Sequence, residues 1–327
     1  MAEIRLGALT IYGYGLAVAA AAVLGLVFAA RNCRRNGIAP DALSWFAVLA
    51  IPMGVLGARL LYYIACLKFD FAGFFDFTDG GFTLYGAMGG AVLAAVIAAR
   101  LTGEKPARLL DQLAAPAALT IGFSRLAEGL VGQGYGWYVA DWFDPEMGMS
   151  LVHLEDYSFF ERFPFAIMDM YEEWSWAIFV WEALVAFALC IVLLKTPARR
   201  AGWRAMLFAV MYASLQALNE GLRQDAVLRW GFVRINQVIS AVVIAALLAV
   251  CCIKLPRPRS VKKIIGAWIG VVASMGVVMA MEFALEKKIM FLEWMPMDLC
   301  YVVMFAACIG MIFAFRSVWK TSGVTEG

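Results

Sequence analysis

Long apolar stretches alternate with shorter polar connections along the whole chain. Most of the stretches reach the roughly 17–25 residues that an α-helix needs to cross a bilayer. Their recurrence predicts an all-α, polytopic helical membrane protein. We expect the spans at residues 9–30, 43–66, 83–101, 109–131, 174–195, 203–222, 232–254, 264–284 and 296–316.

The charge of the connections alternates from one span to the next. Lys and Arg gather after the first, third, fifth, seventh and ninth spans. In the connections 68–81 and 133–173, by contrast, most of the charged residues are Asp and Glu. Loops rich in Lys and Arg mark the cytoplasmic side of a membrane. We therefore expect an outside N-terminus and a cytoplasmic C-terminus.

The composition agrees with a membrane protein and argues against several other classes of protein. The chain is 63% hydrophobic and 16% charged, against about 45–50% and about 25% in soluble domains. The cluster of positives Arg31, Arg34 and Arg35 follows the first apolar stretch, which does not end in a small-residue cleavage site, so we expect no removed signal peptide. No basic tract with interleaved aromatics suggests a nucleic-acid partner. Seven cysteines without C-x-x-C spacing, and His153 as the only histidine, predict no metal site and no cofactor.

Two segments fall outside the regular alternation of spans and short loops. Residues 133–173 are rich in Trp, Tyr and Phe, which are typical of the membrane interface, and we expect an external lid there. Residues 255–263, "LPRPRSVKK", predict a basic cytoplasmic linker. Beyond it, residues 264–327 are expected to add two transmembrane helices and a short cytoplasmic tail.

Ionisable and amide side chains inside the predicted spans are the main functional candidates, because such groups usually face the bundle interior and mark substrate pathways. The alternative for each is a hydrogen bond between helices or a side chain that extends to the interface. We favour that alternative for Asp111, and it is open for Arg223. The candidates are Arg59, Asp111, Arg125, Glu128, Glu182, Gln216, Glu220, Arg223 and Gln237.

Arg125 and Glu128 form the most informative pair, since residues three apart share one face of a helix. They can neutralise each other, although a buried pair carries a large desolvation penalty. An arginine is also suited to binding a phosphate through a forked contact. The glycines after Glu128 let a headgroup or a neighbouring helix approach the backbone. A phospholipid-headgroup site and simple helix packing both remain open.

The stretch "FTLYGAMGG" poses the same choice. Close helix packing accounts for Gly86 and the two glycines that follow it. Tyr85 lies at the outer end of the predicted span, where its phenol can hydrogen-bond a headgroup or rest at the interface.

Several segments in order resemble the prolipoprotein diacylglyceryl transferase family. They are "LGALTIYGYG", "IPMGVLGARLLYYI", "GGFTLYGAMGGAVLAAVIAARL", "LLDQLAAPAALTIGFSRLAEGLVGQGYG", "MYASLQALNEGLRQD" and "RINQVIS". The resemblance runs from about residue 6 to residue 254. It implies a seven-helix domain over residues 1–254 and a place in the bacterial plasma (inner) membrane.

The resemblance also implies an activity and a set of site residues. The family transfers the diacylglyceryl group of phosphatidylglycerol to a cysteine thiol in prolipoprotein signal peptides, and glycerol phosphate leaves. We accordingly expect a membrane-embedded monomer that uses no cofactor and binds these two substrates. The resemblance implies catalytic positions at Arg125, Glu128, Tyr85, Glu220 and Tyr212. It implies substrate-binding positions at Arg59, Arg223, Gln237, Gln216, Glu182 and Gly86.

Four positions depart from the family pattern. Glu128 and Val131 stand where the family has Asn, Gln133 where it has Glu, and Gln216 where it has Arg. These departures keep a second hypothesis open, a relative that binds anionic phospholipid or lipopeptide without turnover. A small-molecule transporter is a more distant alternative, because the chain shows no internal duplication and no paired broken spans.

Overall fold

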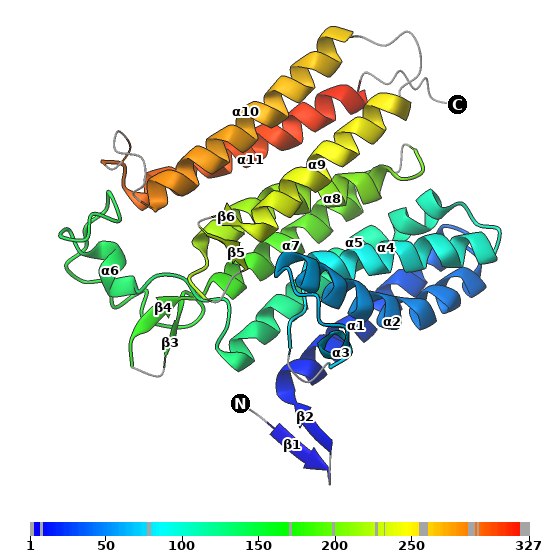
Figure 1. Cartoon of the computed structure of the whole chain (residues 1–327), viewed down its shortest axis with the longest axis horizontal. Helices are drawn as coiled ribbons and strands as arrows, with labels where there is room; N and C mark the ends of the chain where they lie inside the picture. The colour runs from blue at the N-terminus through cyan, green and yellow to red at the C-terminus, as the bar shows by residue number, and fades with distance from the viewer. Residues whose placement is uncertain are drawn as a thin grey trace. The chain divides into compact units, whose positions relative to one another are not determined.

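The structure is a computed structural model, and Figure 1 shows the chain. It describes residues 3–320 apart from 7–8, 77–79, 170–171, 198–199, 226–227, 232, 255–260, 287–291 and 293. The chain divides into two compact units that are described separately below. The first unit comprises Met1–Ala127 and Ala186–Phe208, and the second comprises Glu128–Val185 and Ala209–Gly327.

A long helix occurs at each of the nine predicted spans. Their bounds are α1 (Gly13–Arg35), α2 (Pro40–Ala65), α4 (Leu84–Leu101), α5 (Pro106–Glu128), α7 (Ile178–Lys195), α8 (Trp203–Leu222), α9 (Ile235–Lys254), α10 (Val261–Leu285) and α11 (Met297–Lys320). In the described part of the chain, seven of these are long and apolar enough to cross a membrane. The other two, α5 and α8, carry several of the candidate ionisable side chains. The chain is a polytopic helical membrane protein.

The first predicted span begins too early and ends too early. Strand β2 (Leu9–Tyr12) pairs antiparallel with β1 (Glu3–Leu6), and α1 starts only at Gly13. The β-branched residues Thr10 and Ile11 favour an extended strand. At the other end α1 continues to Arg35, because basic side chains stabilise the last turn of a helix.

The fifth predicted span also starts later than expected. Strand β4 (Trp174–Trp176) pairs antiparallel with β3 (Ala166–Met168), and α7 begins at Ile178. Strand β3 lies in the expected lid, whereas β4 falls in the predicted span. The lid also contains the short helix α6 (Val139–Phe143).

In the first unit, α2 packs closely along α4. A Cβ atom placed on Gly86 would collide with the carbonyl oxygen of Gly57, and one on Gly90 with that of Met53. Small residues permit such backbone contact between membrane helices. Gly89, by contrast, has nothing within 4 Å of its Cβ position.

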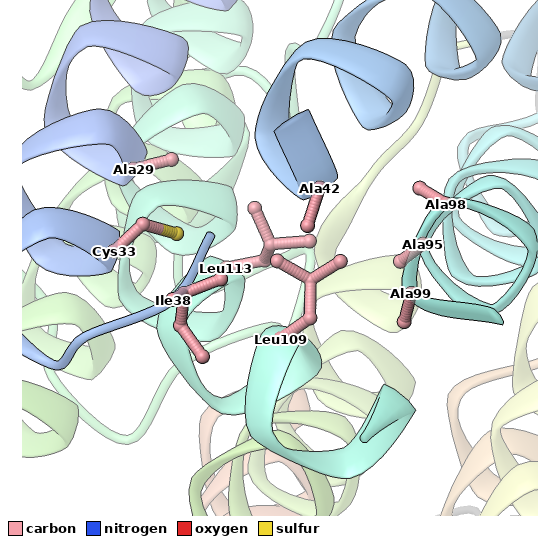
Figure 2. Close-up of a cluster of buried hydrophobic side chains, with 9 residues drawn as sticks. All are labelled: Ala29, Cys33, Ile38, Ala42, Ala95, Ala98, Ala99, Leu109 and Leu113. Carbon is pink, nitrogen blue, oxygen red and sulfur yellow. The ribbon is translucent and has the colours of Figure 1, made fainter. Parts of the chain in front are cut away.

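The apolar core of the first unit joins four helices. Figure 2 shows side chains from α1, α2, α4 and α5 and from the loop after α1 converging there. The buried members are Ala29, Cys33, Ile38, Ala42, Ala95, Ala98, Ala99, Leu109 and Leu113. Near this core Asp111 accepts hydrogen bonds from the backbone N–H groups of Gly202 (2.7 Å) and Ala205 (3.0 Å), so its role is to cap α8.

In the second unit, α10 and α11 lie side by side, and both contact α9 (Figure 1). A short hairpin of β5 (Arg229–Trp230) and β6 (Val233–Arg234) leads into α9. Of the expected linker 255–263, residues 255–260 lie outside the described residues, and 261–263 form the first turn of α10.

The lid has a small core of its own in the second unit. Val139, Phe143 and Ala166 are buried, and several half-buried aromatic side chains pack around them. The lid also bonds to the start of α11, because Asp298 Oδ2 accepts from Leu151 N (2.8 Å) and from Ser150 Oγ (3.1 Å). The lid is therefore held both by its own apolar core and by these bonds to α11.

Candidate functional site

A buried cluster of ion pairs surrounds Arg223, which follows the end of α8 in the second unit. The guanidinium donates from Nε to Asp225 Oδ1 (2.9 Å) and from Nη2 to Asp225 Oδ2 (2.6 Å). Its Nη1 atom lies 3.0 Å from Glu128 Oε2 and 3.1 Å from Glu182 Oε2. One guanidinium therefore faces three carboxylates, and all four residues are buried.

The backbone after α5 is shaped to fit this cluster. A 3₁₀ turn, η2 (Gly129–Val131), follows Glu128, and Gly134 has a left-handed φ of 76°. A Cβ atom on Gly134 would lie 2.8 Å from Glu128 Oε2. The N–H group of Gly134 donates to Asp225 Oδ2 at 2.9 Å. Glycine is needed here both for its φ and for the close approach of the carboxylate.

Asp225 is held in its ionised form by these contacts. Burial alone would raise the pKa of this carboxyl group. The hydrogen bonds and the positive charge of Arg223, with the N–H group of Gly134, outweigh burial and hold the pKa below its ordinary value. The fork between Arg223 and Asp225 is thus charged on both sides at neutral pH.

Glu220 occupies a different electrostatic environment one turn earlier on α8. It is 1% exposed. Its Oε1 accepts from Asn236 Nδ2 (3.0 Å) and its Oε2 from Gln216 Nε2 (3.3 Å). Among the residues that the structure describes, its carboxylate is held by neutral amides, whereas those of Glu128 and Glu182 pair with a cation.

A second guanidinium, that of Arg234, closes the end of α8. Its Nη1 donates to the carbonyl oxygens of Glu220 and Arg223, the latter at 2.9 Å. Its Nε lies 3.5 Å from Glu282 Oε2. Gln237 donates from Nε2 to the other oxygen of Glu282.

An apolar cavity of about 240 Å³ lies in the same unit. It is lined by Trp137, Trp142, Trp176, Ile178, Trp181 and Leu222. Leu222 immediately precedes Arg223, so the turn that carries the guanidinium also forms one wall of the cavity. An aromatic lining beside fixed polar groups is typical of ligand sites.

The structure brings together six of the eleven predicted site residues. These are Glu128, Glu182, Gln216, Glu220, Arg223 and Gln237. The open question about Arg223 is answered, because its side chain is buried in the cluster rather than extended to an interface. Tyr212 is buried on α8, one turn before Gln216.

The other four predicted site residues belong to the first unit. Arg125 is buried in the last turn of α5, and Tyr85 is half-buried in the first turn of α4. Arg59 donates to the carbonyl oxygens of Gly73 (2.7 Å) and Asp76 (2.6 Å), and so stabilises the loop after α2. Gly86 contacts α2, as described above. Their roles in substrate binding stay predictions.

Sequence reasoning did not single out Asp225, Arg234 or Glu282. Asp225 lies beyond the predicted span, although the order Arg-x-Asp was a usable signal. Arg234 and Glu282 fall inside predicted spans 232–254 and 264–284, so the rule that selected the other ionisable residues could have found both.

Comparison with known proteins relates the sequence of this chain to one family. The sequence profile of the prolipoprotein diacylglyceryl transferases matches residues 2–253. A phosphatidylglycerol–prolipoprotein diacylglyceryl transferase of Bacillus licheniformis is 27% identical over 79% of this chain and 94% of its own length. Proteins of that name from Listeria monocytogenes and Bacillus cereus are 26% and 29% identical, over 74% and 72% of this chain and 84% and 85% of their own lengths.

Proposed function

Because the chain belongs to the prolipoprotein diacylglyceryl transferase family, we propose that it transfers the diacylglyceryl group of phosphatidylglycerol to a cysteine thiol of a prolipoprotein signal peptide. The thiol sulfur forms a bond to the glycerol carbon of the lipid, and the bond from that carbon to the phosphate oxygen breaks. Glycerol phosphate leaves, and the thiol proton passes to a base. The observation that carries the proposal is the buried cluster around Arg223 and Glu220, inside the region that matches the family.

The leaving phosphate needs aimed cationic groups in a medium of low dielectric constant. We assign phosphate binding to Arg125, which is buried near the end of α5, and we assign a second cationic role to Arg223. The carboxylates around Arg223 hold its guanidinium in one orientation before substrate arrives. A fixed guanidinium stabilises developing charge without reorganising during the reaction.

The thiol must lose its proton, because the thiolate is the nucleophile and a free cysteine has a pKa of about 8.5. We assign the proton acceptor to Glu220. Its carboxylate accepts hydrogen bonds from the amides of Gln216 and Asn236, and within the described part of the chain it forms no ion pair with a guanidinium. Glu128 is the weaker candidate, since it lies 3.0 Å from Arg223 Nη1.

We also propose how the chain lies in the membrane. Lys and Arg gather in the odd-to-even connections, which puts those connections in the cytoplasm and the N-terminus outside. The turn that follows α8 then lies at the outer side, where signal peptides of exported proteins emerge. We expect the protein to act as a monomer.

The test is release of glycerol phosphate by the purified full-length protein in vesicles that contain phosphatidylglycerol. A synthetic peptide with one signal-peptide cysteine serves as acceptor, and the same peptide with serine is the control. We expect release and a mass increase of the cysteine peptide only. Failure to release glycerol phosphate, together with failure to modify prolipoprotein in a transferase-depleted strain, would contradict the proposal.

A second candidate is a relative that binds anionic phospholipid or lipopeptide without turnover. The observation in its favour is that Arg223 already pairs with three carboxylates, with which an incoming phosphate must compete. The same assay separates the two candidates, because a binder retains labelled phosphatidylglycerol and releases no glycerol phosphate.

A further inference from the structure

The last two helices reach the polar cluster from outside the region that matches the family. That region ends at residue 253, whereas α10 and α11 begin at Val261 and Met297. Glu282 on α10 and Tyr301 on α11 are both buried at 8% exposure. Both contact the short turn of residues 220–223 at the end of α8, either directly or through one other side chain.

Glu282 acts on this turn through Arg234. Its Oε2 lies 3.5 Å from Arg234 Nε, and its Oε1 accepts from Gln237. Arg234 in turn donates to the carbonyl oxygens of Glu220 and Arg223. The last carbonyl groups of a helix have no partner within the helix, so Arg234 closes the end of α8 from a position that Glu282 fixes.

Tyr301 acts on the same turn directly. Its hydroxyl group donates to the carbonyl oxygen of Gly221 at 3.1 Å. Its ring stacks on Trp142, a wall of the apolar cavity, with ring centroids 6.1 Å apart and an angle of 18°. A Cβ atom on Gly221 would lie 2.9 Å from Glu282 Oε1, so this turn is in close contact with both added helices.

We propose that Glu282 and Tyr301 are positioning residues that hold the turn 220–223, and with it the carboxyl group of Glu220 and the guanidinium of Arg223, in the arrangement needed for transfer. As far as turnover is concerned, this inference rests on the proposed function. A shift of about 1 Å at a reacting group can reduce a rate by about 100-fold. The two added helices are therefore a part of the site that the family match does not cover.

The experiment uses the full-length protein with Glu282→Gln and Tyr301→Phe. The first change removes the charge that faces Arg234 and keeps the size of the side chain; the second removes only the hydroxyl group. The matched control is Glu286→Gln on the same chain segment, because Glu286 pairs with the exposed Arg229 at 3.2 Å. Glu282→Asp tests whether restoring the carboxylate restores function.

Two measurements are made on each variant. Hydrogen exchange reports the backbone amides of residues 218–225, and we expect faster exchange in both test variants and wild-type exchange in the control. In the release assay we expect turnover to fall by about 10- to 100-fold with the KM for phosphatidylglycerol unchanged, and Glu282→Asp to regain part of it.

The outcomes separate this inference from the proposed function. Exchange and turnover of Glu282→Gln and Tyr301→Phe equal to those of Glu286→Gln would overturn the positioning role. Absence of release by the wild-type protein would contradict the proposed function alone, and hydrogen exchange would then decide the positioning role. Should Glu282→Gln fail to fold, Tyr301→Phe decides the question by the same two measurements.

Discussion

Arg223 and Asp225 are joined by two parallel hydrogen bonds although a single residue separates them. The chain must bend back at once after α8 to allow this fork, and the N–H group of Gly134 completes it by donating to Asp225. The fork fixes the plane of the guanidinium, which leaves Nη1 facing Glu128 and Glu182. The contact between Arg223 and Asp225 thus sets the orientation of a guanidinium that also binds carboxylates from α5 and α7.

The fork predicts a stability effect with a defined pH dependence. Asp225→Asn removes one charge of a buried pair, and we expect unfolding to become easier by about 3–5 kcal/mol at pH 7. The pKa of Asp225 is lowered in the folded protein, so its contribution is present above the unfolded value of about 3.9 and is lost as the pH falls through the folded value. The difference in Tm between wild type and variant should therefore shrink below about pH 4.

Thermal unfolding in detergent between pH 3 and pH 8 measures this difference. The control is Glu146→Gln, since Glu146 is exposed in a lid turn. A difference in Tm that stayed constant down to pH 3 would show that Asp225 does not contribute through its charge.

The proton-acceptor assignment predicts a catalytic effect without a folding effect. Glu220→Gln keeps the side-chain size, and its amide oxygen can still accept from either Gln216 or Asn236, but it cannot accept the thiol proton. We expect glycerol phosphate release to fall by about 100- to 10,000-fold while binding of labelled phosphatidylglycerol is retained. Release within threefold of wild type would move the role to Glu128 or Tyr85.

The phosphate-binding assignment predicts that Arg125→Ala strongly reduces transfer. Removing one group that stabilises developing charge reduces turnover on the order of 100- to 1,000-fold. Arg108→Ala on the same helix is the control, because its side chain is 45% exposed and pairs with Glu104. Membrane insertion, measured by fractionation, should be equal in the two variants. Prolipoprotein modification by Arg125→Ala at the wild-type rate in a transferase-depleted strain would refute the assignment.

The glycine contacts of α4 predict a stability difference between two neighbouring positions. Gly86→Ala would place a methyl group against the carbonyl oxygen of Gly57, which typically costs about 1–3 kcal/mol. Gly89→Ala meets nothing within 4 Å and should be neutral or stabilising, since alanine favours a helix over glycine. Thermal unfolding distinguishes the two. Equal Tm values with a raised KM for Gly86→Ala would instead support substrate binding at Gly86.

The helices were predictable from the sequence because membrane helices need long apolar runs, and the chain has one at each expected place. The errors lie at the ends of spans, where a few apolar residues carry little information. Residues 9–12 read equally well as helix or strand, and pairing with residues 3–6 decides for the strand. The predicted family is confirmed by the profile match over residues 2–253.

The sequence predicted most of the residues of the polar cluster, but it did not predict which of them contact each other. The spacing of Arg125 and Glu128 left open whether they pair with each other or bind a headgroup, whereas the fold brings Arg223 to Glu128. Such a contact depends on how the turn after α8 packs against the turn after α5, and a local sequence pattern does not predict that packing. Asp225 was overlooked for the same reason. It lies outside the predicted span, and it joins the cluster only because the chain bends back after α8 and brings it to Arg223.

The hydrogen bonds between Asp298 and the lid limit which segments can be exchanged between this chain and other members of the family. A chimaera that joined residues 1–253 of another transferase to residues 254–327 of this chain would present the Asp298 carboxylate to a lid loop of different sequence. Its bonds to Ser150 and Leu151 would then have to be replaced. The lid and the helices α10 and α11 should therefore coevolve, so neither can be exchanged without the other.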